Sequence, residues 1–186
     1  NTIRVEDDHY RAECIVIATG GRPIIPEIDG AELGISSNGF FELPDRPQRV
    51  ALVGSGYVAV ELSGVFNALG SDTTVLVRKD GMLRNFDQML RRKLHKSIQQ
   101  NGIGLVTDVV PQALERTSDG LKLIAQDGRE FGSFDSIVWA VGRTPNTEHL
   151  HLDAAGVETD DYGFVSVDDY QTTNVDNIFA LGDVTG

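Results

Sequence analysis

The ten residues from Val50 to Ala59 have the sequence VALVGSGYVA, which is the strongest indication of the fold in this chain. Its first four residues are apolar, which predicts a short strand that is buried on both faces. The next six fit the pattern Gly-x-Gly-x-x-Gly/Ala, which joins a strand to a helix in dinucleotide-binding units: Gly54, Ser55, Gly56, Tyr57, Val58 and Ala59. The stretch therefore predicts a turn that binds the pyrophosphate of a dinucleotide.

The small residues of this turn each serve a separate purpose. Gly54 permits the sharp change of direction after the strand. Gly56 has no Cβ, so a pyrophosphate can approach the backbone and meet the positive end of the following helix. Ala59 is small enough for that helix to pack closely on the strand.

The chain continues as a predicted helix over 57–69 and a strand over 73–77, which complete a βαβ unit, and Arg78 follows that strand. In NAD sites an acidic residue stands at this place and binds the ribose hydroxyls. An acid would repel the 2′-phosphate of NADP, whereas a guanidinium binds it with paired hydrogen bonds. Arg84 lies in the loop beyond and is expected to bind the same phosphate. We therefore predict that residues 50–84 bind NADPH in preference to NADH.

The remaining pattern predicts an α/β protein with a Rossmann-like three-layer sheet and an antiparallel meander. Cys14–Ile17 is expected to be a strand buried on both faces, and a connector rich in proline and glycine follows it up to Pro47. The other predicted elements are a strand at 2–5, a helix over 87–100, a strand at 103–106, the meander over 109–131, and strands at 137–141, 164–167 and 178–181.

A weak internal repeat relates two distant segments. Residues 2–23 and 121–145 each run strand, turn and strand, and then end a buried strand on Ala-x-Gly, with a proline after two further residues. The repeat favours two nucleotide-binding units of common design.

Composition excludes several classes of function. A net charge of −12 over 186 residues argues against nucleic acid as a partner, because phosphate binding needs a basic surface. Basic residues gather only in 78–96, where most are expected to line a solvated helix face. No apolar run approaches the roughly 18 residues of a membrane span, and the N-terminus does not resemble a signal peptide. With one cysteine the chain cannot form an internal disulfide, which fits the cytoplasm.

Several further stretches lie in the order found in one enzyme family. They are GSGYVAVEL at 54–62, VRKDGMLRNFD at 77–87, SNGFF at 37–41, IATG at 17–20, WAVGRTPN at 139–146 and IFALGD at 178–183. Together they resemble the NADPH domain of the glutathione reductases, within the pyridine-nucleotide disulfide oxidoreductases, over nearly the whole chain. The resemblance implies NADP(H) and FAD as cofactors, glutathione disulfide as substrate, a role in redox homeostasis, and a homodimer formed through a C-terminal domain.

The same resemblance implies roles for single residues. Tyr57 matches the tyrosine that covers the flavin ring and swings away when nicotinamide enters. Glu61 matches a glutamate beside the nicotinamide, and Gly142 matches a glycine that passes close to NADPH. Four residues match positions on the FAD side: Thr19, Gly20, Arg143 and Asp183.

The chain holds no catalytic nucleophile, acid or metal site that we recognise in the sequence. The family's redox cysteine pair lies upstream of a chain like this one, whereas Cys14 is expected to be core packing. The four histidines, His9, His95, His149 and His151, show no metal or dyad spacing. We therefore expect a piece of a longer polypeptide that binds NADPH without turnover by itself.

Two classes of function stay open at this point. In the first, the chain belongs to a glutathione-disulfide reductase, with residues 46–145 binding NADPH and residues 1–45 and 146–186 belonging to the FAD domain. Trypanothione, mycothione or mercuric reductases are alternatives within that class. In the second, the chain is a stand-alone NADPH-binding module without catalysis.

Overall fold

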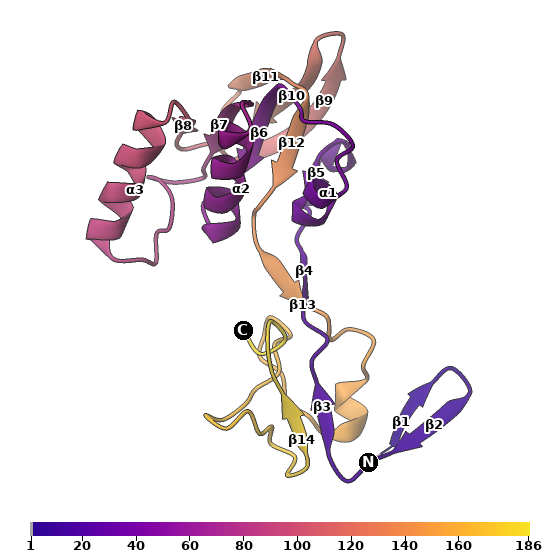
Figure 1. Ribbon diagram of the computed structural model, residues 1–186. Helices are drawn as coiled ribbons and strands as arrows, with labels where there is room; N and C mark the ends of the chain where they lie inside the picture. Colours follow the sequence, from indigo (N-terminus) through magenta and orange to yellow (C-terminus); the bar gives the residue numbers. More distant parts are fainter. Residues whose placement is uncertain (1) are drawn as a thin grey trace. The chain divides into compact units, whose positions relative to one another are not determined.

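The computed structural model describes residues 2–186, which divide into two compact units (Figure 1). The first unit consists of the chain up to Arg22 together with Arg143–Gly186, and the second consists of Pro23–Gly142. Residues 23–45 therefore belong to the second unit, whereas the sequence grouped them with residues 1–22. The assignment of each unit to one nucleotide stays a prediction.

A parallel sheet forms the centre of the second unit. Its strand order is β5-β12-β6-β7-β8, and every neighbouring pair is parallel. In that order the strands are Ile35–Ser36, Ser136–Trp139, Arg49–Val53, Asp72–Leu76 and Gly104–Val106. Val53 of β6 is level with Trp139 of β12 and with Leu76 of β7. The carboxyl ends of these three strands therefore meet at one edge of the sheet, where the glycine-rich turn begins.

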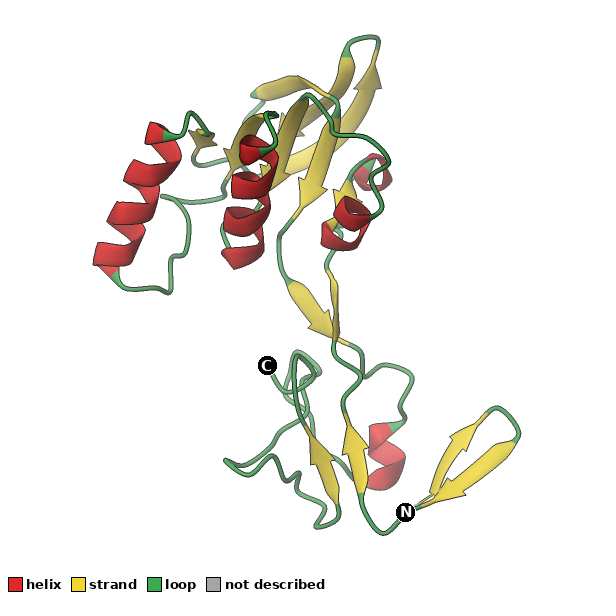
Figure 2. Cartoon of the chain, in the orientation of Figure 1, coloured by secondary structure: helices red, strands yellow, loops and turns green. Residues whose placement is uncertain are grey.

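Both faces of this sheet are covered, which confirms the predicted three-layer arrangement (Figure 2). One face carries α1 (Ser37–Phe41), α2 (Tyr57–Ala68) and α3 (Gln88–Gln100), and the other carries the antiparallel meander β9–β10–β11. The meander strands are Pro111–Thr117, Gly120–Ala125 and Glu130–Phe134. Val50 and Leu52 pack with the helices, whereas Ala51 and Val53 pack with the meander. This alternation explains why the strand is apolar throughout.

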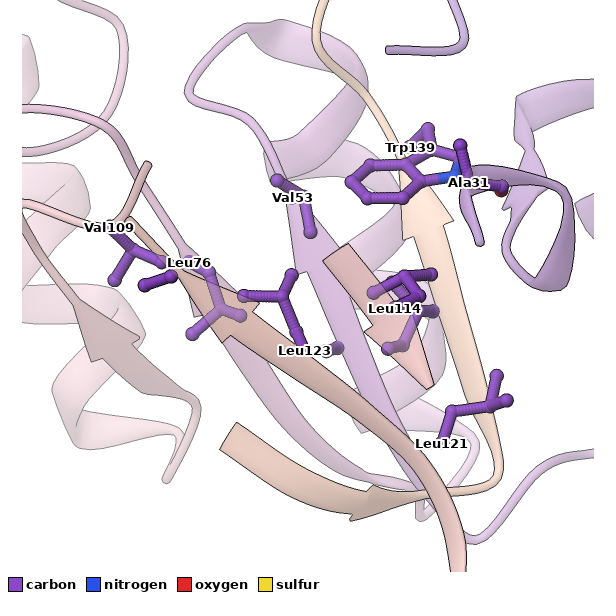
Figure 3. Packing of buried hydrophobic residues seen from close by; sticks show 11 residues of the cluster. Ala31, Val53, Leu76, Val109, Leu114, Leu121, Leu123 and Trp139 are labelled. Carbon is purple, nitrogen blue, oxygen red and sulfur yellow. Dashed lines mark hydrogen bonds between the residues drawn. The ribbon is translucent and has the colours of Figure 1, made fainter. Parts of the chain in front are cut away.

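Figure 3 shows the core on the meander side, where Leu121 and Leu123 point toward the sheet. The indole Nε1 of Trp139 donates a hydrogen bond of 2.8 Å to the carbonyl oxygen of Ala31, in the short 3₁₀ helix η1 (Ala31–Leu33). This bond ties the segment after Pro23 to the sheet. It gives a physical reason why residues 23–45 belong to the second unit.

The first unit is built from short pairs of strands. β1 (Thr2–Val5) and β2 (Asp8–Arg11) form an antiparallel hairpin, and β3 (Ile15–Ile17) lies parallel to β14 (Ile178–Ala180). β4 (Gly21–Pro23) pairs with β13 (Arg143–Pro145), and the 3₁₀ helix η2 spans Leu152–Ala155. The apolar core of this unit is small: Ile17, Val157, Val165, Ile178, Ala180 and Val184.

Three expectations for single segments were wrong. Among the described strands β3 pairs with β14 alone, and one apolar cluster packs on it, so it is not buried on both faces; Val16 is 57% exposed. Cys14 precedes the strand and is exposed, so it is not core packing in the described residues. Val165 makes a single bridge to Thr159 in place of the strand predicted at 164–167. The segment before Pro47, which was expected to be a connector, also contains regular elements, namely β5 and α1.

The internal repeat corresponds to a repeated order of elements. The hairpin β1–β2 is followed by β3 and β4, and the hairpin β10–β11 is followed by β12 and β13. The two segments that end in Pro23 and Pro145 are the pair β4–β13. Within residues 2–186 no helix is both long and apolar enough to cross a membrane.

Candidate nucleotide-binding site

The glycine-rich turn leaves β6 at a point where only glycine fits. Gly54 has φ +142°, and a Cβ built there would lie 2.1 Å from the carbonyl oxygen of Ala140. The N–H of Gly54 donates a hydrogen bond to the carbonyl oxygen of Leu76 at 3.0 Å. The N–H of Ala140 donates to the carbonyl oxygen of Val53, the residue before Gly54, at 2.8 Å. The turn is therefore fixed to the two neighbouring strands β7 and β12.

The N-terminus of α2 opens onto free space beyond the turn. Gly56 is the N-cap residue, and no side chain caps the helix there. A Cβ on Gly56 would meet no atom within 4 Å, whereas Ala59 one turn later is fully buried. The first N–H groups of a helix have no partner inside the helix and carry its positive end. This combination fits a pyrophosphate.

Arg78 lies two residues beyond Leu76, the last residue of β7, and its side chain has no partner among residues 2–186. The backbone before it is fixed, because Val77 donates to the carbonyl oxygen of Val106 and accepts from the N–H of Val109. The side chain of Arg78 is exposed, and it forms no hydrogen bond or ion pair with any described residue. Its guanidinium is therefore free to bind an anion beside the turn.

The segment 78–84, here called the arginine loop, returns to the glycine-rich turn. The N–H of Leu83 donates to the carbonyl oxygen of Ser55 at 2.7 Å. Arg84 comes next and is exposed. The pKa of Asp80 lies below its ordinary value, mainly because Arg91 donates a hydrogen bond to it and to a smaller degree because of the charge on Arg84. The loop thus places a second arginine close to the turn.

Tyr57, Glu61 and Gly142 also lie in the second unit. Tyr57 begins α2 and is 55% exposed, and Glu61 is exposed one helical turn later. Gly142 has φ +146°, and its carbonyl oxygen accepts a hydrogen bond from the N–H of Ile24. Val58 is half-buried. The structure leaves Tyr57, Glu61 and Gly142 accessible from solvent.

The four predicted FAD-side residues lie in the first unit. Arg143 Nε forms an ion pair of 3.0 Å with Asp183 Oδ2, and its Nη2 donates to the carbonyl oxygen of Gly21 at 2.6 Å. Gly20 has φ +65°, and Thr19 Oγ1 donates to the carbonyl oxygen of Asn146. Arg143 therefore joins Asp183 to the backbone at Gly21, next to Gly20.

Asn146 was not among the predicted site residues. Its Nδ2 donates to the carbonyl oxygen of Thr19 at 2.9 Å, and its Oδ1 accepts from Arg22. All three of these residues also line a hollow of about 460 Å³, together with Glu148, His149 and Leu150. The Ala-x-Gly-x-x-Pro pattern shared by 18–23 and 140–145 could have predicted that these two segments pair, but it does not include Asn146.

The histidines and acids offer no metal centre in the described part of the chain, where no group of three or more such ligands comes together. His95 instead has a structural partner, since its Nε2 accepts a hydrogen bond from the N–H of Met82 at 3.1 Å.

Comparison with known proteins agrees with this geometry. The family model described as "Pyridine nucleotide-disulphide oxidoreductase" matches residues 1–186. The chain belongs to this family. Curated relatives in it include the glutathione reductases of Yarrowia lipolytica, 42% identical over 180 residues, and of Schizosaccharomyces pombe, 44% identical over 180 residues. Each match covers 95% of this chain but only 38% and 39% of the relative, so the chain spans about two fifths of their length.

Solved structures of the family share the fold. The HOCl-induced flavoprotein disulfide reductase RclA from Escherichia coli is 26% identical, with a TM-score of 0.89 over 99% of this chain and 43% of that one. LpdA from Mycobacterium tuberculosis is also 26% identical, with a TM-score of 0.84 over 96% of this chain and 39% of that one. The chain is therefore a Rossmann-like part of a flavoprotein disulfide reductase fold.

Proposed function

We propose that this chain is the NADPH-binding part of an FAD-dependent disulfide reductase, with flanking segments of the FAD domain, and that the substrate is glutathione disulfide. The two curated relatives named glutathione reductase support the choice of substrate, at 42% and 44% identity. The redox disulfide and the substrate site would lie in residues outside this chain. By itself the chain binds NADPH and does not complete the reaction.

One observation carries the cofactor preference. Arg78 stands exposed just beyond β7, where an NAD site has an acid, and it has no hydrogen-bond or ion-pair partner in the described part of the chain. The hydrogen bond from the N–H of Leu83 to the carbonyl oxygen of Ser55 joins the loop that holds Arg84 to the glycine-rich turn. Two exposed arginines on a loop that is bonded to this turn favour a ligand with an additional phosphate.

The residues present fit both cofactors. The open space in front of Gly56 would admit the pyrophosphate of NADPH, since a Cβ there meets nothing within 4 Å. In the first unit, Asp183 is 57% exposed and uses only Oδ2 for Arg143, so its other oxygen can accept a hydrogen bond from the ribityl chain of FAD. Thr19 and Gly20 would lie on the same FAD side.

Each unit then has its own task. Residues of the second unit bind NADPH and orient its nicotinamide, with Tyr57 covering the flavin ring until nicotinamide enters and Glu61 and Gly142 beside the nicotinamide end. When bound, FAD supplies the chemistry that accepts hydride from NADPH and passes two electrons to a protein disulfide. The resulting thiols reduce glutathione disulfide by thiol–disulfide exchange.

The proposal extends to assembly and location. A homodimer in the cytoplasm suits a glutathione reductase, and the single cysteine is compatible with a reducing compartment. Assays of the full-length protein with NADPH and glutathione, trypanothione or mycothione disulfide, or with Hg(II), separate the substrate classes. Turnover of glutathione disulfide at least about tenfold above the others in kcat/KM is expected; a preference for any other substrate would replace glutathione disulfide in the proposal.

The cofactor preference is tested by Arg78→Glu. A carboxylate at this place repels the 2′-phosphate and can accept hydrogen bonds from a free ribose, so the variant should lose the preference for NADPH over NADH. Arg92→Glu is the matched control, because Arg92 is an exposed arginine on α3 without a hydrogen bond or ion pair in residues 2–186. An unchanged NADPH/NADH affinity ratio in Arg78→Glu would remove the assignment.

A further inference from the structure

The middle of the arginine loop is bound by side chains from α3. The N–H of Met82 donates to Nε2 of His95 at 3.1 Å, and the carbonyl oxygen of Met82 accepts from Nε of Arg91 at 3.4 Å. Arg91 also forms an ion pair of 3.2 Å with Asp80. Both backbone polar groups of one loop residue are therefore held by two side chains that lie one helical turn apart.

Packing fixes the same part of the loop. The side chain of Met82 is fully buried in the core cluster that contains α2 and α3. Gly81 has φ +140°, and a Cβ there would lie 2.2 Å from Cε1 of His95, so the imidazole lies against this glycine. Leu83 has φ +51° and donates to Ser55. Three consecutive residues thus have a defined path immediately before Arg84.

We infer that His95 is a positioning residue for the 2′-phosphate of NADP(H): it holds the arginine loop so that Arg78 and Arg84 meet that phosphate. The inference rests on the proposed function. His95 does not touch the ligand in this assignment. It acts through Met82, because the backbone position of Met82 sets the position of Arg84 two residues later.

The chemistry of imidazole makes this contact sensitive to protonation. Only neutral imidazole has a bare Nε2 that can accept the N–H of Met82; imidazolium is a donor at both nitrogens. Within four residues of His95 on α3 the charged residues are Arg91, Arg92, Lys93 and Lys96, and the loop bonded to His95 holds Arg78, Lys79, Asp80 and Arg84. Protonation would therefore remove the hydrogen bond and add a positive charge to a part of the chain, residues 78–96, in which basic residues outnumber acids. It should release the loop and weaken binding of the 2′-phosphate.

The test uses the full-length protein and two probes that differ only in the 2′-phosphate, adenosine 2′,5′-bisphosphate and adenosine 5′-monophosphate. Their dissociation constants are measured by calorimetry at about pH 8 and about pH 5.5, on either side of the usual titration of histidine. His95→Leu removes the acceptor, and His95→Gln replaces it with an amide oxygen that does not titrate. Lys96→Gln is the matched control, since it removes a charge from the next, exposed position of α3.

At pH 8 we expect His95→Leu to bind the bisphosphate about tenfold more weakly, with monophosphate binding within about twofold of the wild type. His95→Gln should retain most of the affinity, and Lys96→Gln should change it by less than about twofold. The 2′-phosphate itself takes up a proton near pH 6, which weakens binding in every variant. Between about pH 8 and about pH 5.5 the affinity of the wild type for the bisphosphate should therefore fall at least about threefold more than that of His95→Gln. This difference separates the effect of the imidazole from that of the phosphate.

Wild-type affinity for the bisphosphate in His95→Leu, or equal losses on acidification in wild type and His95→Gln, would overturn the role of His95 while leaving the proposed function intact. If His95→Leu does not fold, the pH comparison with His95→Gln decides. If the wild type itself binds both probes equally, the proposed function fails first.

Discussion

The N–H of Leu83 donates to the carbonyl oxygen of Ser55 across 2.7 Å, which joins the arginine loop to the glycine-rich turn. The two residues belong to different parts of the βαβ unit, one before α2 and one after β7. Because Ser55 stands between the two glycines of the turn, a movement of the loop would change the surroundings of the proposed pyrophosphate site. The proposed preference for NADPH therefore depends on the path of the loop.

The turn itself should not tolerate a side chain at Gly54. Gly54→Ala combines a φ of +142° with a Cβ 2.1 Å from a backbone oxygen, so we expect a loss of about 2–4 kcal/mol in unfolding free energy and a loss of NADPH binding. Urea unfolding and calorimetry measure the two effects. Gly64→Ala is the control: Gly64 lies exposed inside α2 with nothing near its Cβ position, and alanine there should stabilise by about 0.5–1 kcal/mol. Equal stability of both variants would contradict the strain at Gly54.

Acid should weaken the second unit through Asp135. Hydrogen bonds from Arg49 hold the pKa of the Asp135 carboxyl below its usual range; Arg49 Nη2 donates to Oδ1 at 2.8 Å, and the N–H groups of Gln48 and Arg49 donate to Oδ2. A lowered pKa in the folded state stabilises above the unfolded value of about 3.9, and this stabilisation is lost as pH falls through the folded pKa.

Asp135→Asn should therefore lose less stability than the wild type between about pH 5 and pH 2, as measured by thermal unfolding. Asp161→Asn serves as the control, because Asp161 is exposed and makes no hydrogen bond or ion pair in the described chain. Parallel acid profiles of wild type and Asp135→Asn would show that this carboxylate does not contribute.

Flavin retention should depend on Asp183. In the full-length protein, Asp183→Ala removes the acceptor for the ribityl chain and leaves Arg143 without its ion pair. We expect the purified variant to contain less than about one tenth of the wild-type flavin, measured by visible absorbance against protein concentration. Asp176→Ala, an exposed acid in the same unit, should retain full flavin content. Full flavin content in Asp183→Ala would remove this residue from the FAD site.

Sequence periodicity was sufficient for the central strands of the second unit because the parallel sheet is covered on both faces. The run from Val50 to Val53 alternates between two apolar layers, so every position must be apolar, and the pattern is visible without a structure. Val16 shows the opposite case. The same β-branched pattern occurs around it, but β3 has one neighbouring strand and a core on one face, so the run is not buried.

Gly54 was predictable because the backbone geometry of the turn accepts only glycine, whereas the role of Arg78, inferred from ligand charge, stays a prediction. The bonds of Met82 with His95 and Arg91 were not predictable, because they join backbone groups to side chains on another element. The helix and strand propensities of neighbouring residues carry no information about such a contact. The pairing of Asn146 with Thr19 was missed for the same reason.

The preference for NADPH is tested most directly by titrating the protein with NADPH and NADH at about 0.05 M and about 0.5 M salt. NADPH should bind more tightly than NADH, and its advantage should shrink at the higher salt concentration, because the charges of Arg78 and Arg84 are exposed and screened over a shorter Debye length. Equal affinities for the two nucleotides at low salt would contradict the assignment of Arg78 and Arg84 to the 2′-phosphate.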